Sequence, residues 1–337
     1  MTATRIYLDN NATTQPLPTV TEAVMLALET LWGNPSSIHR IGQEARHKVD
    51  LAREQVADLI GAKPAEITFT SGGTEAANLA IQTACASKPN QSVLVTSQIE
   101  HAAVGEMMDR LKLEGMEVVH LRNDNNGVFC LEHLQQILEE RADDIAVVSL
   151  MWCNNETGVI EPIEKATALC RKHDVLMHSD GTQWVAKMPV DVQDVQVDLL
   201  TFAAHKFHGP KGVGALYTRT GLTVSPLVTG GPQERGRRGG TENVPSIMGF
   251  GVACEEAVAW LTKENITDME SLRAQFEQLV RANFQSIHIY SSGAPRAWTT
   301  SSISFPNVKG ELLLLMLSER GVCASSGSAC SSGAFKE

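Results

Sequence analysis

The sequence predicts an α/β protein in which a mostly parallel β-sheet carries helices on both faces. Three observations support this prediction: β-rich runs recur at regular intervals, helix-compatible patterns lie between them, and the chain is long enough to bury a large core. The β-rich runs are 66–70, 92–97, 145–150, 175–180 and 197–204. The helical patterns lie at about 74–86, 101–114, 131–141 and 162–173, where they serve as crossover connections between parallel strands.

The other expected elements lie at the two ends of the chain. Apolar residues recur at helical spacing from Ala45 to Ile60, and Gly61 supplies the stop. The region from about 245 to 284 is helix-rich, and it precedes a strand-like run at 301–306 and an apolar helix at 311–319. We expect a large domain at 14–255 and a smaller domain formed by 1–13 and 256–337.

Composition and charge exclude several classes of protein. Of 337 residues, 43% are hydrophobic and 20% are charged, which disfavours disorder and a coiled coil. The 28 basic and 39 acidic residues give a net charge of −11, so we expect no direct nucleic-acid partner and no membrane partner. The start lacks the pattern of a secretory signal, and we expect a cytoplasmic location.

The cysteine count indicates neither a disulfide framework nor a metal site. The seven cysteines are odd in number, and none forms a CxxC pair. Cys330 differs from the others because Ser and Gly surround it in the segment GVCASSGSACSSGAF at 321–335. We expect a mobile, solvent-reachable thiol there, suited to a nucleophile that attacks in one place and delivers its cargo in another. Metal binding or a disulfide with Cys323 is a weaker alternative.

Polar or Gly-rich sequence follows each β-rich run, where ligands bind in a parallel sheet. In FTSGGTEAANLAI (69–81), a Gly-Gly turn precedes a helix that begins near Thr74, which suits a phosphate cradle or an ordinary N-capped turn. His101 lies at a strand-to-helix junction, and Asn154 and Asn155 follow another strand. Each of these side chains also fits a purely structural role.

Asp180 and Lys206 each close an apolar strand. A carboxylate at the end of an apolar strand is costly to bury without a nearby cation. A lysine at such a position, considered alone, is more often a surface residue or part of an ion pair than a catalytic group. Taken together with the phosphate cradle, the two residues meet the needs of pyridoxal 5′-phosphate. The lysine forms a Schiff base with the aldehyde, and the carboxylate keeps the pyridine nitrogen protonated so that the ring withdraws electrons.

Motifs along nearly the whole chain resemble those of one known family. They are YLDNNATT (7–14), GNPSSIHRIGQEAR (33–46), TSGGTEAAN (70–78), EHAAV (100–104), NNETGVI (154–160), HSDGTQ (178–183), AAHKFHGPKGVGALY (203–217), GGPQERGRRGGTENV (230–244) and SSGSACSSG (325–333). The chain resembles the cysteine desulfurases of the group-I (IscS/NifS-like) branch, within the class-V aminotransferase family. This resemblance implies the pyridoxal-phosphate fold type I: a large domain with a mostly parallel seven-stranded sheet flanked by helices, and a smaller α+β domain that is incomplete here.

The resemblance also implies roles for the residues that would meet the ring of the cofactor and the substrate. It implies that Lys206 is the Schiff-base lysine and that Asp180 is the partner of the pyridine nitrogen. Gln183 would hydrogen-bond the phenolic oxygen, and His101 would stack on the ring and help to move protons. Cys330 would attack the sulfur of the substrate.

Further roles concern the cofactor phosphate and the substrate. By the same resemblance, Gly73, Thr74 and His205 would hold the phosphate, and Thr241 would reach the phosphate site of the partner subunit in a homodimer. Asn155 would lie close to the substrate. No metal ligand is implied.

The implied reaction converts L-cysteine to L-alanine and leaves sulfur as a persulfide on Cys330, for iron–sulfur cluster, thio-cofactor or tRNA biosynthesis. The implied partners are L-cysteine, a second subunit and a sulfur-acceptor protein such as an iron–sulfur scaffold. Two departures from the family are Ala203, where a serine is usual, and the end at Glu337, before an arginine that binds the substrate carboxylate. Selenocysteine lyase, another fold-type-I activity and a non-catalytic scaffold are the alternatives.

Overall fold

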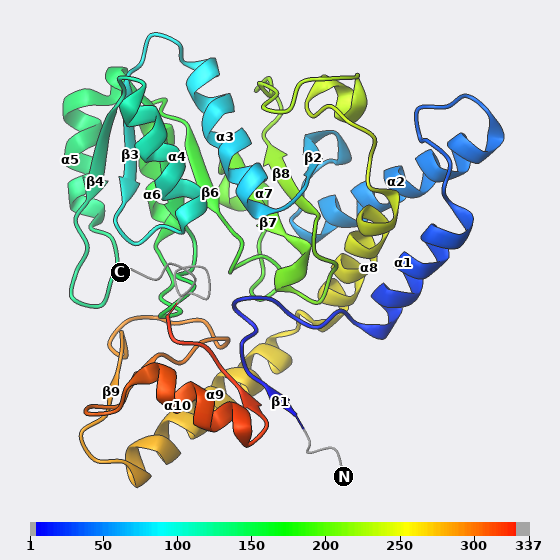
Figure 1. Ribbon diagram of the computed structural model, residues 1–337. Coiled ribbons are helices and arrows are strands. Elements are labelled where there is room, and N and C mark those ends of the chain that lie inside the picture. The colour runs from blue at the N-terminus through cyan, green and yellow to red at the C-terminus, as the bar shows by residue number, and fades with distance from the viewer. Residues whose placement is uncertain (1–4, 328–337) are drawn as a thin grey trace.

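A seven-stranded sheet forms the centre of the molecule (Figure 1). The structure is a computed structural model that describes residues 5–327. Across the sheet the strands are β2 (Ile67–Thr70), β8 (Gly214–Thr218), β7 (Leu199–Ala203), β6 (Met177–Asp180), β5 (Ile145–Met151), β3 (Val93–Ser97) and β4 (Glu117–Leu121). Strand β8 runs antiparallel to both neighbours, and the other pairs are parallel. The predicted mostly parallel sheet is confirmed.

Helices cover both faces of this sheet, because neighbouring residues of each buried strand point to opposite sides. On β3, Leu94 packs in the core with α3 (Gly73–Ser87) and α4 (Ala102–Leu113). Val93 and Val95 pack in the opposite core. The helices of that second core include α2 (Arg40–Leu59), α5 (Leu131–Arg141), α6 (Ile163–Lys172) and α8 (Val244–Trp260).

The end of α2 follows the sequence prediction. Ile60 caps the helix, and Gly61 has the left-handed backbone (φ +68°) that favours glycine. A Cβ atom at Gly61 would lie 2.5 Å from Oδ1 of Asp191. Both the backbone conformation and the lack of space therefore select glycine at this position.

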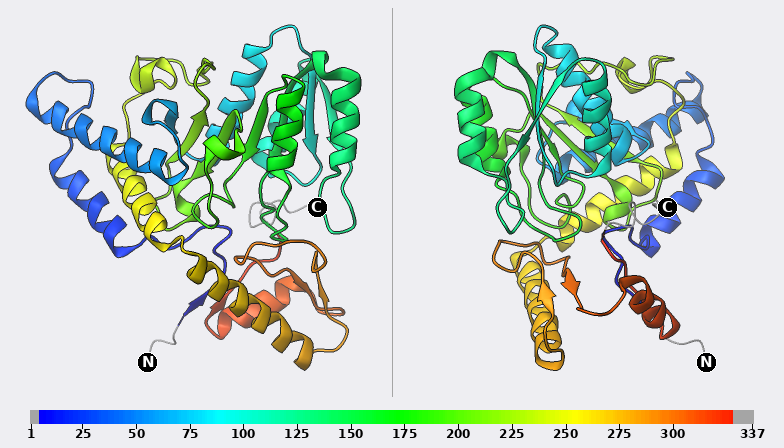
Figure 2. Two further views of the ribbon diagram at one scale, coloured as in Figure 1. Left: turned by 180° about the vertical axis from the view of Figure 1, so that it is seen from behind. Right: turned by 60° about the vertical axis from the view of Figure 1, so that its left-hand side comes forward.

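The remaining elements lie largely below the sheet in Figure 1, and Figure 2 shows the same arrangement from two further directions. Strand β1 (Ile6–Tyr7) pairs in parallel with β11 (Val322–Cys323), and β9 (His288–Ile289) pairs with β10 (Ile303–Ser304). Helices α9 (Lys263–Asn283) and α10 (Gly310–Glu319) match the helices expected from the sequence. The expected division into two domains stays a prediction.

Several described elements were absent from the expectations. They are α1 (Pro18–Thr30), α7 (Val192–Val195), β1, β4, β8, β9, β11 and the 3-10 turns η1 (Pro64–Glu66), η2 (Ala142–Asp144), η3 (Ala204–Lys206) and η4 (Gln233–Gly236). Within residues 5–327, no single helix is long and apolar enough to cross a membrane. Helices α8 and α9 pass that test only as a pair bent by 85°.

Candidate active site

One cavity lies beyond the carboxyl ends of the parallel strands, and most of the predicted site residues line it. Asp180 ends β6, and Ala203 ends β7 immediately before η3, which carries His205 and Lys206. Thr74 comes from the start of α3, and His101 caps α4. The full lining is Ala12, Gly73, Thr74, His101, Ala103, Met151, Cys153, Asn155, Asp180, Thr182, Gln183, Ala203, His205 and Lys206.

Asp180 is buried, with 7% of its surface exposed, and strand β6 fixes its position. Its Oδ1 atom accepts a hydrogen bond of 2.9 Å from the backbone N–H of Thr182. A buried carboxylate has a large desolvation penalty unless it meets a cation or a protonated group. The position of Asp180 on the cavity wall therefore suits a protonated ring nitrogen.

Lys206 lines the cavity beside the Asn11–Ala12 segment. Its Nζ atom donates to the carbonyl oxygens of Asn11 at 2.6 Å and Ala12 at 3.0 Å. The neighbouring Thr14 N–H donates to the carbonyl oxygen of His205 at 2.9 Å, which ties the N-terminal segment to η3. These contacts hold the amine at the cavity wall.

The N-terminus of α3 forms one end of the cavity. Within the described chain, the capping residue Gly72 provides no side-chain hydrogen bond, so the first N–H groups of the helix remain available to an anion. A Cβ atom at Gly73 would lie 3.3 Å from Oγ1 of Thr182 and 3.6 Å from Cβ of Ala203. Glycine therefore keeps this end of the cavity open for a phosphate group.

Two histidines, His101 and His205, line the cavity. Nδ1 of His101 accepts from the backbone N–H of Ala103 at 3.0 Å, which assigns the ring proton to Nε2. Burial lowers the pKa of His205 to about 4, with further contributions from Lys206, Lys211 and Lys187. At neutral pH His205 is therefore uncharged, and its Nδ1 lies 3.2 Å from Oγ1 of Thr13.

Behind Asp180 lie two titratable groups that burial keeps neutral. Burial raises the pKa of Glu100 to about 8, and repulsion from Asp180 adds to this effect. Oε1 of Glu100 accepts from Oγ of Ser97 at 2.8 Å and from the backbone N–H of Met151 at 2.9 Å. Burial also lowers the pKa of His178 to about 4, although Asp180 opposes this shift. Of these three groups, Asp180 is the one that lines the cavity.

Gln183 and Asn155 are linked through the N-terminal segment. Nε2 of Gln183 donates to the carbonyl oxygen of Asn11 at 2.9 Å. Nδ2 of the same Asn11 donates to the carbonyl oxygen of Asn155 at 3.1 Å and to Oγ1 of Thr300 at 2.7 Å. Asn11 therefore joins three segments that are distant in the sequence.

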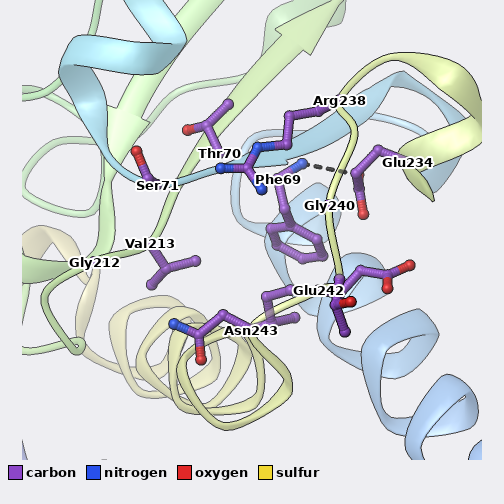
Figure 3. A pocket seen from close by; sticks show the side chains of 12 residues that line it. Phe69, Thr70, Ser71, Gly212, Val213, Glu234, Arg238, Gly240, Glu242 and Asn243 are labelled. Atoms are coloured by element: carbon purple, nitrogen blue, oxygen red, sulfur yellow. Dashed lines mark hydrogen bonds between the residues drawn. The ribbon is translucent and has the colours of Figure 1, made fainter. Parts of the chain in front are cut away.

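Thr241 lies in a second cavity, apart from the residues above. This cavity is bounded by the end of β2 and by the loop from Arg238 to Asn243 (Figure 3). Arg238 pairs with Glu75 at 2.9 Å, and Glu234 accepts from the backbone N–H of Phe69 at 2.9 Å. Thr241 itself is exposed.

The predicted nucleophile, Cys330, lies outside the described residues. The last described residue, Gly327, comes close to the turn that holds Asn155. A Cβ atom at Gly327 would lie 3.7 Å from Oε2 of Glu156. The described part of the Gly/Ser-rich segment therefore ends beside the cavity wall.

Sequence reasoning missed several residues of this site. Asn11, Glu100 and Thr182 lie inside motifs that were recognised, but their own side chains were not singled out. Lys187 is buried next to Gln183 and was also missed. Its only signal in the sequence is a lone charge inside the apolar run WVAKM at 184–188.

The residues present fit pyridoxal phosphate by their chemistry. The cavity has a carboxylate for a protonated ring nitrogen, an amine for an aldehyde and a helix N-terminus for a phosphate. In addition, Oδ1 of Asn11 is a buried oxygen that has no hydrogen-bond partner among the described residues. This donor and acceptor set matches the groups that the cofactor presents.

Comparisons with known proteins agree with this chemistry. The family model "Aminotransferase class-V" matches residues 6–337. A cysteine desulfurase from Nostoc sp. is 42% identical over 331 residues, which cover 98% of this chain and 82% of that protein. A solved NifS-like protein has a TM-score of 0.89 and 39% identity, covering 96% of this chain and 87% of its own. The solved structure of SspA in complex with cysteine has a TM-score of 0.83 and 32% identity, covering 98% and 91%.

Proposed function

The chain belongs to the class-V aminotransferase family and is a pyridoxal-phosphate-dependent cysteine desulfurase, and we propose that Lys206, Asp180 and Cys330 carry its chemistry. The observation that supports this assignment is that Lys206 and Asp180 line one cavity with the N-terminus of α3 at its end. The fold is that of the pyridoxal-phosphate enzymes of type I.

Several side chains of the cavity then have a role in binding the cofactor or in moving a proton. When bound, the cofactor supplies an electrophilic aldehyde carbon and an electron-withdrawing ring. Asp180 would hold the proton on the ring nitrogen, and Gln183 would donate from Nε2 to the phenolic oxygen. The N–H groups of Gly73 and Thr74, together with His205, hold the phosphate.

Proton transfer falls to Lys206 and His101. The Nζ atom of Lys206, released from its contacts with Asn11 and Ala12, takes the proton from Cα of cysteine. His101 exchanges a proton at Nε2, because its Nδ1 is occupied by the backbone N–H of Ala103. Asn155 lines the wall that faces the substrate.

The sulfur-transfer step requires a thiolate within reach of the cavity. Gly327 lies beside Glu156, and three residues of chain extend at most about 11 Å to Cys330. The Cys330 thiolate forms an S–S bond with the substrate sulfur while the Cβ–S bond breaks. Overall, L-cysteine and the Cys330 thiol yield L-alanine and a persulfide, with no external oxidant or reductant.

The persulfide has to pass its sulfur to an acceptor. We propose an acceptor protein with a free thiol, such as an iron–sulfur scaffold, to which the outer sulfur moves as Cys330 returns to a thiol. This chemistry requires reduced cysteines, and the described cysteines are free thiols, which supports a reducing compartment such as the cytoplasm.

We also propose that the enzyme acts as a homodimer in which Thr241 reaches the phosphate site of the second subunit. Large apolar side chains are exposed on α1 and in the segment after it. Leu28, Trp32 and Ile38 have 58%, 71% and 95% of their surface exposed. Several large apolar side chains exposed within one short stretch of the chain are typical of a contact surface between subunits.

Three measurements test the proposed function. Loaded protein should produce one alanine per sulfur from cysteine in the presence of a dithiol, and alanine yield from selenocysteine measures the alternative lyase activity. Cys330→Ala should keep the colour of the bound cofactor and lose sulfide release. Cys323→Ala, a control thiol seven residues earlier, should keep both. Normal persulfide formation in Cys330→Ala would refute the assignment of the nucleophile.

A further inference from the structure

Lys187 is a buried lysine to which the chemistry above gives no role. Only 5% of its surface is exposed, and it lies in the turn that follows Asp180. Its carbonyl oxygen accepts from Nε1 of Trp298 at 2.9 Å, and its N–H donates to the carbonyl oxygen of Trp184 at 3.0 Å. A buried ammonium group has a large desolvation penalty, so its contacts are informative.

The side-chain contact of Lys187 is with Gln183. Its Nζ atom donates to Oε1 of that residue. An ammonium group carries three donors and no acceptor, whereas an amide side chain carries both. A flipped Gln183 amide would place its NH2 group against the ammonium group, donor against donor. Lys187 therefore selects the orientation in which Oε1 points to it and Nε2 points away.

Nε2 of Gln183 points toward the part of the cavity where Lys206 lies. Nε2 of Gln183 donates to the carbonyl oxygen of Asn11 at 2.9 Å, and Nζ of Lys206 donates to the same oxygen at 2.6 Å. The amide donor and the reactive amine thus meet at one point. We propose that Lys187 is a positioning residue, which locks the Gln183 amide so that Nε2 is presented to the phenolic oxygen of the cofactor. This inference rests on the proposed function.

The backbone next to Lys187 supports a selected geometry. Ala186 has φ +64°, in the left-handed region that is unfavourable for a residue with a Cβ atom. The turn is held nonetheless, by N–H groups of Trp184 and Val185 that donate to the carbonyl oxygen of Gly181 at 2.9 Å and 2.8 Å. Such conformations persist where the surrounding structure enforces them, commonly at functional sites.

The charge of Lys187 adds a pH dependence to this role. Burial lowers its pKa to about 7, the Cys153 thiol opposes this shift, and Lys206 adds to it. Lys187 in turn lowers the pKa of His205. A neutral amine accepts as well as donates hydrogen bonds, so it no longer distinguishes the two amide orientations. The preference of the Gln183 amide for one orientation should therefore decrease as the pH rises above about 7.

The test measures the bound cofactor without substrate. Apo protein is titrated with pyridoxal phosphate to obtain a dissociation constant, and the absorption spectrum of the complex is recorded against pH. Lys187→Met should weaken binding by about fivefold to tenfold and shift the spectral titration, because the amide then samples both orientations. Lys187→Arg, which remains a pure donor at every pH tested, should restore the affinity and should keep it above pH 7, where wild-type binding weakens. Lys165→Met, an exposed control on α6, should match wild type.

A second background separates positioning from a general structural role. In Gln183→Leu protein, a further Lys187→Met substitution should change neither readout, because the residue through which Lys187 acts is gone. An equal loss in both backgrounds would overturn the proposal, as would a Lys187→Met spectrum and affinity identical to wild type.

Two further outcomes are also decisive. If circular dichroism shows that Lys187→Met does not fold, cofactor affinity is compared between Lys187→Gln and Lys187→Arg instead. Arginine only donates hydrogen bonds, whereas glutamine also accepts them, so only the arginine variant should bind the cofactor like wild type. Equal behaviour of those two would overturn the proposal. Wild-type protein that binds no cofactor would overturn the proposed function itself, and this inference with it.

Discussion

Replacing Asp180 with asparagine should separate cofactor binding from the stability of the apo protein. Asp180 is 7% exposed, and its Oδ1 accepts from the N–H of Thr182, a bond that an asparagine side chain retains. The substitution removes a buried negative charge and its repulsion of Glu100. We therefore expect the apo protein to melt at the same temperature as wild type or higher.

Cofactor affinity should change in the opposite direction. A hydrogen bond between a carboxylate and a protonated ring nitrogen contributes about 1.5–3 kcal/mol, and an asparagine amide retains only part of this. We expect pyridoxal phosphate to bind about tenfold or more weakly. Turnover should fall further, because a neutral ring withdraws electrons less strongly.

The assay is a titration of apo protein with pyridoxal phosphate, followed by absorbance, beside thermal denaturation of the same apo samples. Asp194→Asn, an exposed carboxylate on α7, is the matched control and should leave both values unchanged. Wild-type affinity in Asp180→Asn, or a clear loss of apo stability with it, would refute this account of the carboxylate.

Three further predictions concern pH, a buried ion pair and the proposed dimer. The pKa of Glu100 is raised to about 8 in the folded state, so the folded protein binds the extra proton and its stability falls as pH rises from about 5 to 8. Glu100→Gln should remove that fall in denaturant titrations, and an unchanged slope would contradict it. Arg53→Met leaves the buried carboxylate of Glu234 without its partner at 2.7 Å, and should lower the free energy of unfolding by about 3–5 kcal/mol. Arg46→Met, in an exposed pair on the same helix, should lower it by less than about 1 kcal/mol, and equal losses would refute the distinction. Trp32→Glu with Ile38→Glu should halve the mass measured by light scattering, whereas Leu113→Glu, 91% exposed on α4, should not. A double variant that stays dimeric would exclude this surface as the interface.

The central strands were predictable because both of their faces are buried. Strands β5 and β7 are near-continuous apolar runs, as expected for parallel strands between two layers of helices. Strand β6 reads MHSD and is buried throughout, and the apolar residues Val175 and Leu176 just before it indicated its position. Each of the three strands was predicted within about two residues at either end. Edge strand β4 was missed because its burial is partial and its residues alternate weakly. Strand β8 was missed because its first residue, Gly214, ends the Gly-rich segment GPKGVG, which reads as a loop.

The candidate site was predictable where polar residues lie at or just after the end of a buried strand, as Asp180 does at the end of β6 and Lys206 does in η3 after β7. The network behind them was not, because it depends on contacts between segments far apart in the chain. Asn11 meets Gln183 across 172 positions and Lys206 across 195. The burial of Lys187 and its contact with Gln183 were likewise not predictable, because a lone lysine in an apolar run does not reveal which side chain it will contact.

The most direct test of the account identifies the amine that binds the cofactor. Borohydride fixes the link between the aldehyde and that amine, and peptide mass spectrometry then locates the phosphopyridoxyl group. The account predicts that Lys206 alone carries it and that Lys206→Ala protein remains unlabelled. Label on Lys187, the buried amine that contacts Gln183, or on a surface lysine would contradict it.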